Sequence, residues 1–117
     1  MVSDELVANS RRNMLETLRD LSCVDRQRKY RDAVPYVHVP VELACQWDQY
    51  SLLMREQQWF RDSLAPAELA AARDFDAAFN SFCDQFGRDL PDLDVLWGDQ
   101  RWADVGLVAA KTLEAFA

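Results

Sequence analysis

The 117-residue sequence carries 20 acidic and 13 basic side chains, a net charge of −7, and half of its residues are hydrophobic. This composition is typical of a globular protein and excludes a disordered one, and the length fits a single domain covering residues 1–117. Only three Gly and four Pro are present, too few for the frequent turns of an all-β sandwich or barrel. The sequence therefore predicts an all-α fold, a single compact bundle of four main helices plus one or two short helices.

The charge is distributed unevenly along the chain. Residues 1–34 have a net charge of +1, whereas residues 35–117 have a net charge of −8. Binding to DNA or RNA without sequence preference needs Lys and Arg side chains that neutralise phosphates, so we expect no nucleic-acid partner. Asp4 and Glu5 stand where a secretion signal would have basic residues, and no apolar run reaches the ~18 residues of a membrane span. We therefore expect a cytoplasmic protein with no membrane partner.

The first third of the chain predicts two helices. Ser3 is a suitable N-cap, and apolar residues recur at helical spacing from there to about Leu21. Ser22 followed by Asp25 resembles a capping box that starts a short basic helix through about Asp32. The most economical interpretation of this basic segment is a solvated helix face in which acidic residues compensate the basic ones.

A proline-bounded linker leads to the middle of the chain. In the stretch "VPYVHVP", residues 34–40, two prolines favour extended backbone, because each one biases the residue before it away from helical dihedrals. Pro40 itself suits the first turn of a helix that continues to about Ser63. Pro66 starts another helix, and Gly87 stands where a left-handed C-terminal cap is expected.

The helix that begins at Pro66 has the clearest apolar periodicity in the sequence. Its apolar positions are Leu69, Ala72, Phe75, Phe79, Phe82 and Phe86. The phenylalanines follow the spacing of a coiled-coil seam, but two heptads are fewer than the three or four that a coiled coil needs. The pattern therefore favours the core of an intramolecular bundle, with the four phenylalanines largely buried.

The segment "GRDLPDLDVLWGDQRW", residues 87–102, is rich in aspartate. An EF-hand loop needs a Gly at its sixth position and a Glu at its twelfth, and counting from Asp89 these positions hold Asp94 and Gln100. This rules out an EF-hand and leaves open only a nonspecific magnesium site. We expect a connector whose leucines contact the core while its aspartates face water, followed by a terminal helix with Asp99 as its N-cap.

Few catalytic or metal chemistries fit the remaining residues. His38 is the only histidine, and Pro40 interrupts the helix that would align it with Glu42 and Cys45 as metal ligands. No nucleophile motif, phosphate-binding glycine loop or metal motif is present. The three cysteines are widely spaced, so we expect no disulfide framework, and we expect Cys45 and Cys83 to be buried and inert. The sequence thus predicts no enzyme activity, no cofactor and no metal.

The acidic and aromatic residues near the C-terminus favour a protein-binding function. A small acidic protein of this kind resembles, as a class, a bacterial immunity protein or antitoxin, an inhibitor that neutralises a basic toxin by direct binding. The partner is then a basic protein, with exposed tryptophans as anchors. The residues predicted to bind it are Asp84, Asp89, Asp92, Asp94, Trp97, Asp99, Trp102 and Asp104. The sequence leaves open the alternative of a small helical enzyme or domain that binds a small molecule between its helices.

Overall fold

The structure, a computed structural model, describes residues 2–117, and the regular elements in this range are all helices. In chain order they are α1 (Asp4–Ser22), α2 (Val24–Ala33), α3 (Val39–Glu56), α4 (Gln58–Asp62), α5 (Pro66–Gln85), α6 (Leu93–Leu96) and α7 (Gln100–Ala115). The predicted all-α fold class is confirmed. None of the helices within residues 2–117 combines the length and the apolar composition that crossing a membrane requires.

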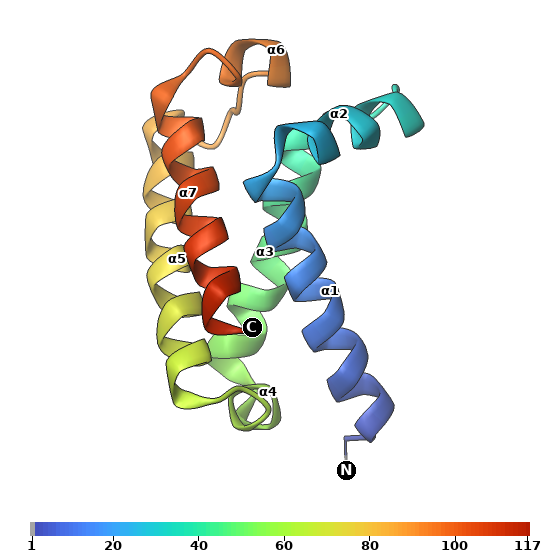
Figure 1. Cartoon of the computed structure of the whole chain (residues 1–117), viewed down its shortest axis with the longest axis vertical. Helices are drawn as coiled ribbons and strands as arrows, with labels where there is room; N and C mark the ends of the chain where they lie inside the picture. Colours follow the sequence, from blue (N-terminus) through green and yellow to red (C-terminus); the bar gives the residue numbers. More distant parts are fainter. Residues whose placement is uncertain (1) are drawn as a thin grey trace.

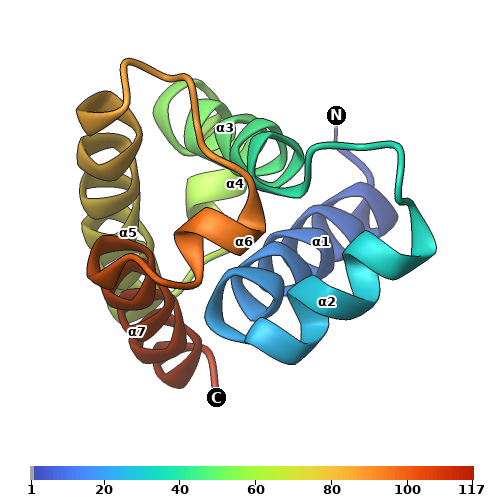
Figure 2. The same ribbon diagram turned by 90° about the horizontal axis from the view of Figure 1, so that it is seen from above.

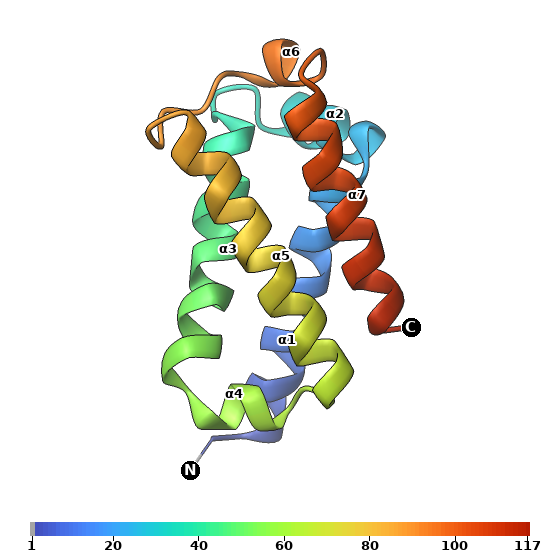
Figure 3. The ribbon, with the colours of Figure 1, turned by 90° about the vertical axis from the view of Figure 1, so that its left-hand side faces the viewer.

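The chain folds into an elongated body of 42 × 27 × 26 Å, and the longest helices run along its length (Figure 1). The C-terminal helix α7 packs directly against both α1 and α5, and α1 also packs against α3. At one end of this body the short helix α4 joins α3 to α5 (Figure 3). At the other end lie α2 and α6, and the view from above shows α6 lying over the middle of the helices (Figure 2).

Aromatic side chains fill the space between α3 and α5. The ring of Trp47 meets that of Phe75 edge-on, with 4.7 Å between centroids, and Phe79 stacks on Phe75 at 5.5 Å. The indole of Trp47 donates a hydrogen bond to the carboxylate of Asp76 at 2.9 Å. Phe75, Phe79 and Phe82 are at most 2% exposed, so their predicted burial is confirmed. We call this set of four aromatic residues, Trp47, Phe75, Phe79 and Phe82, the aromatic layer.

Phe86, the last of the predicted core phenylalanines, is only partly buried. It lies just beyond the end of α5, where the chain turns away from the core. The guanidinium of Arg101 covers its ring, with Cζ 4.3 Å from the centroid. Phe86 is therefore less buried than the other three phenylalanines, although it still packs against the core, with its ring centroid 5.2 Å from that of Phe82.

The single helix predicted from Pro40 to about Ser63 consists of two helices in the structure. The chain becomes extended at Gln57, with φ −116° and ψ 107°. Arg61 donates hydrogen bonds at 2.8 and 3.1 Å to two carbonyls in the last turn of α3, which satisfies acceptors that would otherwise lack partners. The turn also places Phe60 in the core with no exposed surface.

Three of the predicted helix caps are present and one is not. Ser3 accepts a backbone hydrogen bond at the start of α1, and Asp99 does the same at the start of α7. Gly87 follows α5 with φ 60°, the left-handed conformation that favours glycine. The capping box predicted at Ser22 is wrong: this residue belongs to α1, and its hydroxyl donates to the carbonyl of Arg19 at 2.9 Å.

Two contacts fix α1 against the C-terminal half of the chain. The guanidinium of Arg11 makes a bidentate ion pair with Glu68 at 2.9 and 2.6 Å, and Glu68 also accepts from the backbone N–H of Ala65 at 2.8 Å. At the other end of α1, a Cβ on Gly106 would lie 3.3 Å from the carbonyl oxygen of Leu21. Glycine at this position therefore permits the close approach of α7 to α1.

Candidate functional site

The six aspartates predicted to bind a partner lie at one end of the molecule. They come from the last turn of α5, the connector, α6, the N-cap of α7 and the second turn of α7, and these segments adjoin one another (Figure 1). We call this set, Asp84, Asp89, Asp92, Asp94, Asp99 and Asp104, the acidic end. All six side chains are exposed except that of Asp99, which is half-buried. The fold thus gathers carboxylates that are spread over 21 positions of the sequence.

Arginines neutralise half of the acidic end. The ion pairs are Asp84–Arg88 at 2.9 Å, Asp94–Arg31 at 2.9 Å and Asp99–Arg101 at 2.7 Å. Hydrogen bonds from Arg101 hold the pKa of Asp99 below its ordinary value. Asp89, Asp92 and Asp104 make no ion pair with any residue in the described range 2–117. These three carboxylates therefore carry the uncompensated negative charge of this end.

Trp97 lies at the border between the acidic end and the basic helix α2. Its side chain is half-buried, and the guanidinium groups of Arg28 and Arg31 lie over its ring, 5.0 and 4.8 Å from the centroid. Such cation–π contacts stabilise both partners modestly at an exposed site. The basic helix is thus attached to the connector by Trp97 and by the Arg31–Asp94 ion pair, an arrangement that the sequence did not predict.

Trp102 is a core residue and not an exposed anchor. It is 3% exposed, and its indole donates to Oε1 of Gln27 at 3.2 Å. The same oxygen accepts from the indole of Trp97 at 2.9 Å, and the amide nitrogen of Gln27 donates to the carbonyls of Asp20 and Leu21 at the end of α1. The placement of Trp102 on a surface for a partner is therefore corrected, because its only polar atom already has a buried partner.

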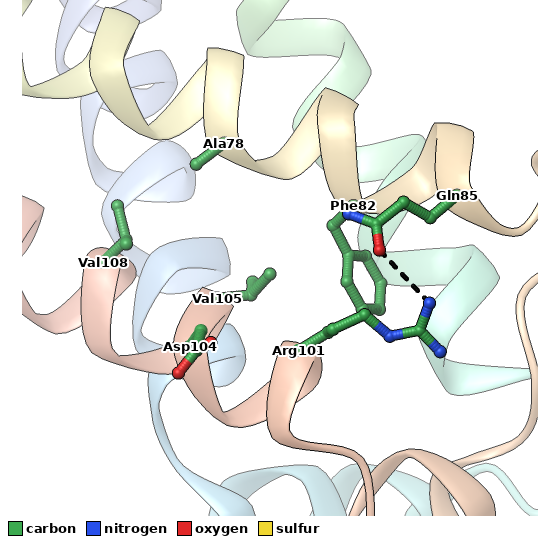
Figure 4. A pocket seen from close by; sticks show the side chains of 7 residues that line it. All are labelled: Ala78, Phe82, Gln85, Arg101, Asp104, Val105 and Val108. Atoms are coloured by element: carbon green, nitrogen blue, oxygen red, sulfur yellow. Dashed lines mark hydrogen bonds between the residues drawn. The ribbon is translucent and has the colours of Figure 1, made fainter.

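A small pocket opens between α5 and α7, next to the acidic end (Figure 4). Its volume is about 150 Å³, and its lining residues are Ala78, Phe82, Gln85, Arg101, Asp104, Val105 and Val108. The guanidinium of Arg101 points to Gln85 and donates to its side-chain oxygen at 3.2 Å. The walls are thus mainly apolar, and the polar groups stand at the helix surfaces that border the opening.

A larger cleft, of about 430 Å³, lies between α1 and α2. Its lining residues are Glu16, Asp20, Arg26, Lys29 and Tyr30. Arg26 bonds both carboxylates of this cleft, and burial raises the pKa of Asp20 against the lowering effect of Arg26. Lys29 makes no ion pair within the described part of the chain. Most of the charge in the cleft is therefore already compensated by residues of the cleft itself.

The cysteines differ in their accessibility. Cys83 is buried, and burial raises the pKa of its thiol to about 11, which makes it unreactive near neutral pH. We expected Cys45 to be buried as well, but it is exposed on α3, because its position lies outside the apolar face of this helix. Among residues 2–117, no group of three or more His, Cys, Asp or Glu side chains is placed to hold a metal ion.

Comparisons of the chain with known protein families, with curated proteins and with solved structures found no match. A function for this protein therefore has to follow from its own geometry and chemistry.

Proposed function

We propose that this protein acts by binding and not by catalysis, and that it recognises a basic protein through the acidic end. The observation that most supports this is the gathering of six aspartates from separate segments at one end, where three have no cationic partner among residues 2–117. Such a surface attracts a basic partner and raises the rate of association. The class of partner that we favour is a basic toxin, which the protein would neutralise as a cytoplasmic, bacterial immunity protein or antitoxin does.

The rest of the fold fits a scaffold for such a surface. We take α1, α3, α5 and α7 as the four main helices of one bundle and one domain, which holds the two ends of the connector in place. Trp97 supplies an aromatic side chain that retains exposed surface at this end. A half-buried tryptophan beside charged groups suits an anchor, since it can bury further apolar area when a partner covers it.

The proposal is tested by the rate of association with a basic partner across a salt series. The first candidate partner is the product of a reading frame next to the gene, provided that it is basic, toxic and copurifies with this protein. The variant changes Asp89, Asp92 and Asp94 to Asn, which keeps the size of the side chains and the N-cap of α6. We expect association about tenfold slower at low salt, with the difference shrinking as salt screens the charges.

The matched control removes equal charge elsewhere. It changes Glu56 to Gln, Asp62 to Asn and Glu114 to Gln, three exposed acidic residues that lie outside the acidic end. These changes should leave the association rate within about twofold of the parent, since screening limits long-range effects to about 8 Å at physiological ionic strength. Equal slowing by both triple variants would show that net charge, and not the acidic end, steers the partner. No slowing by either would refute the proposal.

The alternative function, a helical enzyme or ligand-binding domain, is supported by one observation. The cleft between α1 and α2 has the volume of an ordinary ligand site, and it contains Lys29 and Tyr30. A ligand held there would be a small carboxylate or phosphate bound by Lys29. A rise in the melting temperature with such an anion, abolished by Lys29→Gln, together with no basic protein partner, would favour this alternative.

A further inference from the structure

The pocket between α5 and α7 combines an apolar interior with a carboxylate at its edge (Figure 4). Ala78 and Phe82 from α5 face Val105 and Val108 from α7 across it. Asp104 lies on the α7 side, between Val108 and Arg101 in the view of Figure 4. This carboxylate is exposed and accepts a hydrogen bond from Gln100 at 2.9 Å.

The charges around the pocket leave Asp104 as its uncompensated group. The guanidinium of Arg101 is bound on both sides, to Asp99 at 2.7 and 3.0 Å and to Gln85 at 3.2 Å. It also lies over the ring of Phe86. Asp99 thus neutralises Arg101, whereas Asp104 makes no ion pair with any residue of the described chain. A ligand in this pocket contacts apolar walls inside and one uncompensated negative charge at the edge.

The geometry points to this pocket as the seat of one lysine or arginine side chain of the basic partner. This inference rests on the proposed function, and it names the contact through which the acidic end would hold its partner. Lysine and arginine bury their methylene stems along apolar surface while the charged head stays near water. A space of about 150 Å³ matches a small organic molecule such as benzene, so it suits a single side chain and not a helix or a cofactor.

Simple cations can test the pocket in the isolated protein, without knowledge of the partner. n-Butylammonium reproduces the lysine side chain and n-propylguanidinium that of arginine. Titration of either one is followed by the NMR signals of the methyl groups of Ala78, Val105 and Val108. We expect saturable shifts of these methyl signals with a dissociation constant on the order of 10 mM, the strength that so small a ligand can reach.

Two further ligands separate charge from apolar contact. Butanol has the same chain without the charge, and butyrate carries the opposite charge. The inference predicts that the cations bind about fivefold more tightly than butanol, because of one partly exposed ion pair, and that butyrate binds most weakly. Equal binding of butanol and butylammonium, or tighter binding of butyrate, would overturn it, since the pocket would then recognise an apolar group or use Arg101.

Matched variants locate the interaction. Asp104→Asn should weaken butylammonium about fivefold, whereas Glu114→Gln removes the same charge from α7 outside the pocket and should leave affinity unchanged. Ala78→Met fills the pocket from α5 and should abolish the shifts of the Val105 and Val108 methyl signals while the helical circular dichroism is kept. Equal weakening by the two charge variants, or unchanged binding to Ala78→Met, contradicts the assignment.

The outcomes also separate this inference from the proposed function. The triple Asn variant described above leaves Asp104 intact. Slow association of that variant, together with no binding of butylammonium to the parent protein, would leave the acidic end as the partner surface and refute only the pocket.

Discussion

Different interactions stabilise the aromatic layer and the polar cap, the name we give to the contacts of Gln27 at the C-terminal end of α1. In the aromatic layer, rings of α3 and α5 contact one another edge-on or stacked, and they exclude water almost completely. In the cap, one buried amide, that of Gln27, joins α2 to α1, to the connector and to α7 through four hydrogen bonds. The first region is stabilised mainly by apolar area, whereas in the second a satisfied polar group adds to the burial of Leu93, Leu96 and Trp102.

The two regions should therefore respond differently to the loss of one side chain. Apolar packing is distributed over many contacts, so the loss of one ring costs the transfer free energy of that ring plus the cavity it leaves. A polar network fails through its unpaired members, because each buried donor or acceptor that loses its partner keeps its desolvation penalty. The variants below test this contrast.

The largest effect is expected from Phe79→Ala in the aromatic layer. This side chain is 2% exposed and stacks between Phe75 and Phe82, so its truncation should lower the free energy of unfolding by about 3–5 kcal/mol. Urea denaturation measures the change. Leu52→Ala, which truncates a residue 45% exposed on α3, should cost under about 0.5 kcal/mol. Similar losses for the two variants would mean that the layer is not the core.

Gln27→Ala should destabilise the cap by about 2–3 kcal/mol. The change leaves the indole N–H groups of Trp97 and Trp102 without their buried acceptor. It should also alter tryptophan fluorescence, which Phe79→Ala affects through Trp47 instead. Gln100→Ala serves as control, since this glutamine is exposed and bonds Asp104 at the surface. A stable Gln27→Ala protein with unchanged fluorescence would show that water replaces the amide at no cost.

The ion pair between Arg11 and Glu68 predicts a dependence of stability on pH. The hydrogen bond from Arg11 lowers the pKa of Glu68 from its ordinary value of 4.5. This carboxylate therefore contributes stability above about pH 4.5 that is lost as pH falls through its folded pKa. Glu68→Gln should cost about 1–2 kcal/mol at pH 7 and approach the parent in acid. Burial raises the pKa of Asp20, so the contribution of this residue to stability should change with pH in the opposite direction. A constant difference in stability between the parent and Glu68→Gln at every pH would contradict the role assigned to Glu68.

The smallest effect is expected at the surface of the cap. Asp94→Asn removes the ion pair with Arg31, in which the carboxylate is 79% exposed. Exposed pairs contribute about 0–1 kcal/mol, so the melting temperature should change little and less at high salt. A loss comparable to that of Gln27→Ala would mean that this pair, and not the buried amide, fixes α2 to the connector.

The sequence predicted the features that local pattern controls. Apolar spacing of three and four located α5 and its buried rings, and Ser3, Gly87 and Asp99 marked helix ends because their side chains or backbone act within one turn. The break at Gln57 was missed, since it depends on Arg61 reaching back to α3 and on the burial of Phe60. These contacts exist only after the chain has turned.

The candidate site was predictable in composition but not in electrostatics. The aspartates of residues 84–104 are visible in the sequence, whereas the arginine of α2 that neutralises Asp94 lies 63 positions away. Trp102 begins an apolar stripe with Val105 and Ala109, and this spacing was the signal that it is a core residue. Its hydrogen bond to Gln27 had no such signal, since Gln27 lies in a basic segment far away in the sequence. Polar contacts between distant residues produce no periodic pattern in the sequence. They are therefore harder to predict than apolar helix faces, which do produce one.

The packing of α7 against α1 also bears on how the protein is made. A nascent chain leaves the ribosome with its N-terminus first, so α1 is synthesised well before the helix that covers it at Gly106. Until α7 emerges, α1, which carries the buried residues Met14, Leu18 and Leu21, lacks one of the three helices that it packs against. The native bundle therefore cannot be completed before α7 has been synthesised, and until then the chain exposes an apolar surface that a chaperone would hold.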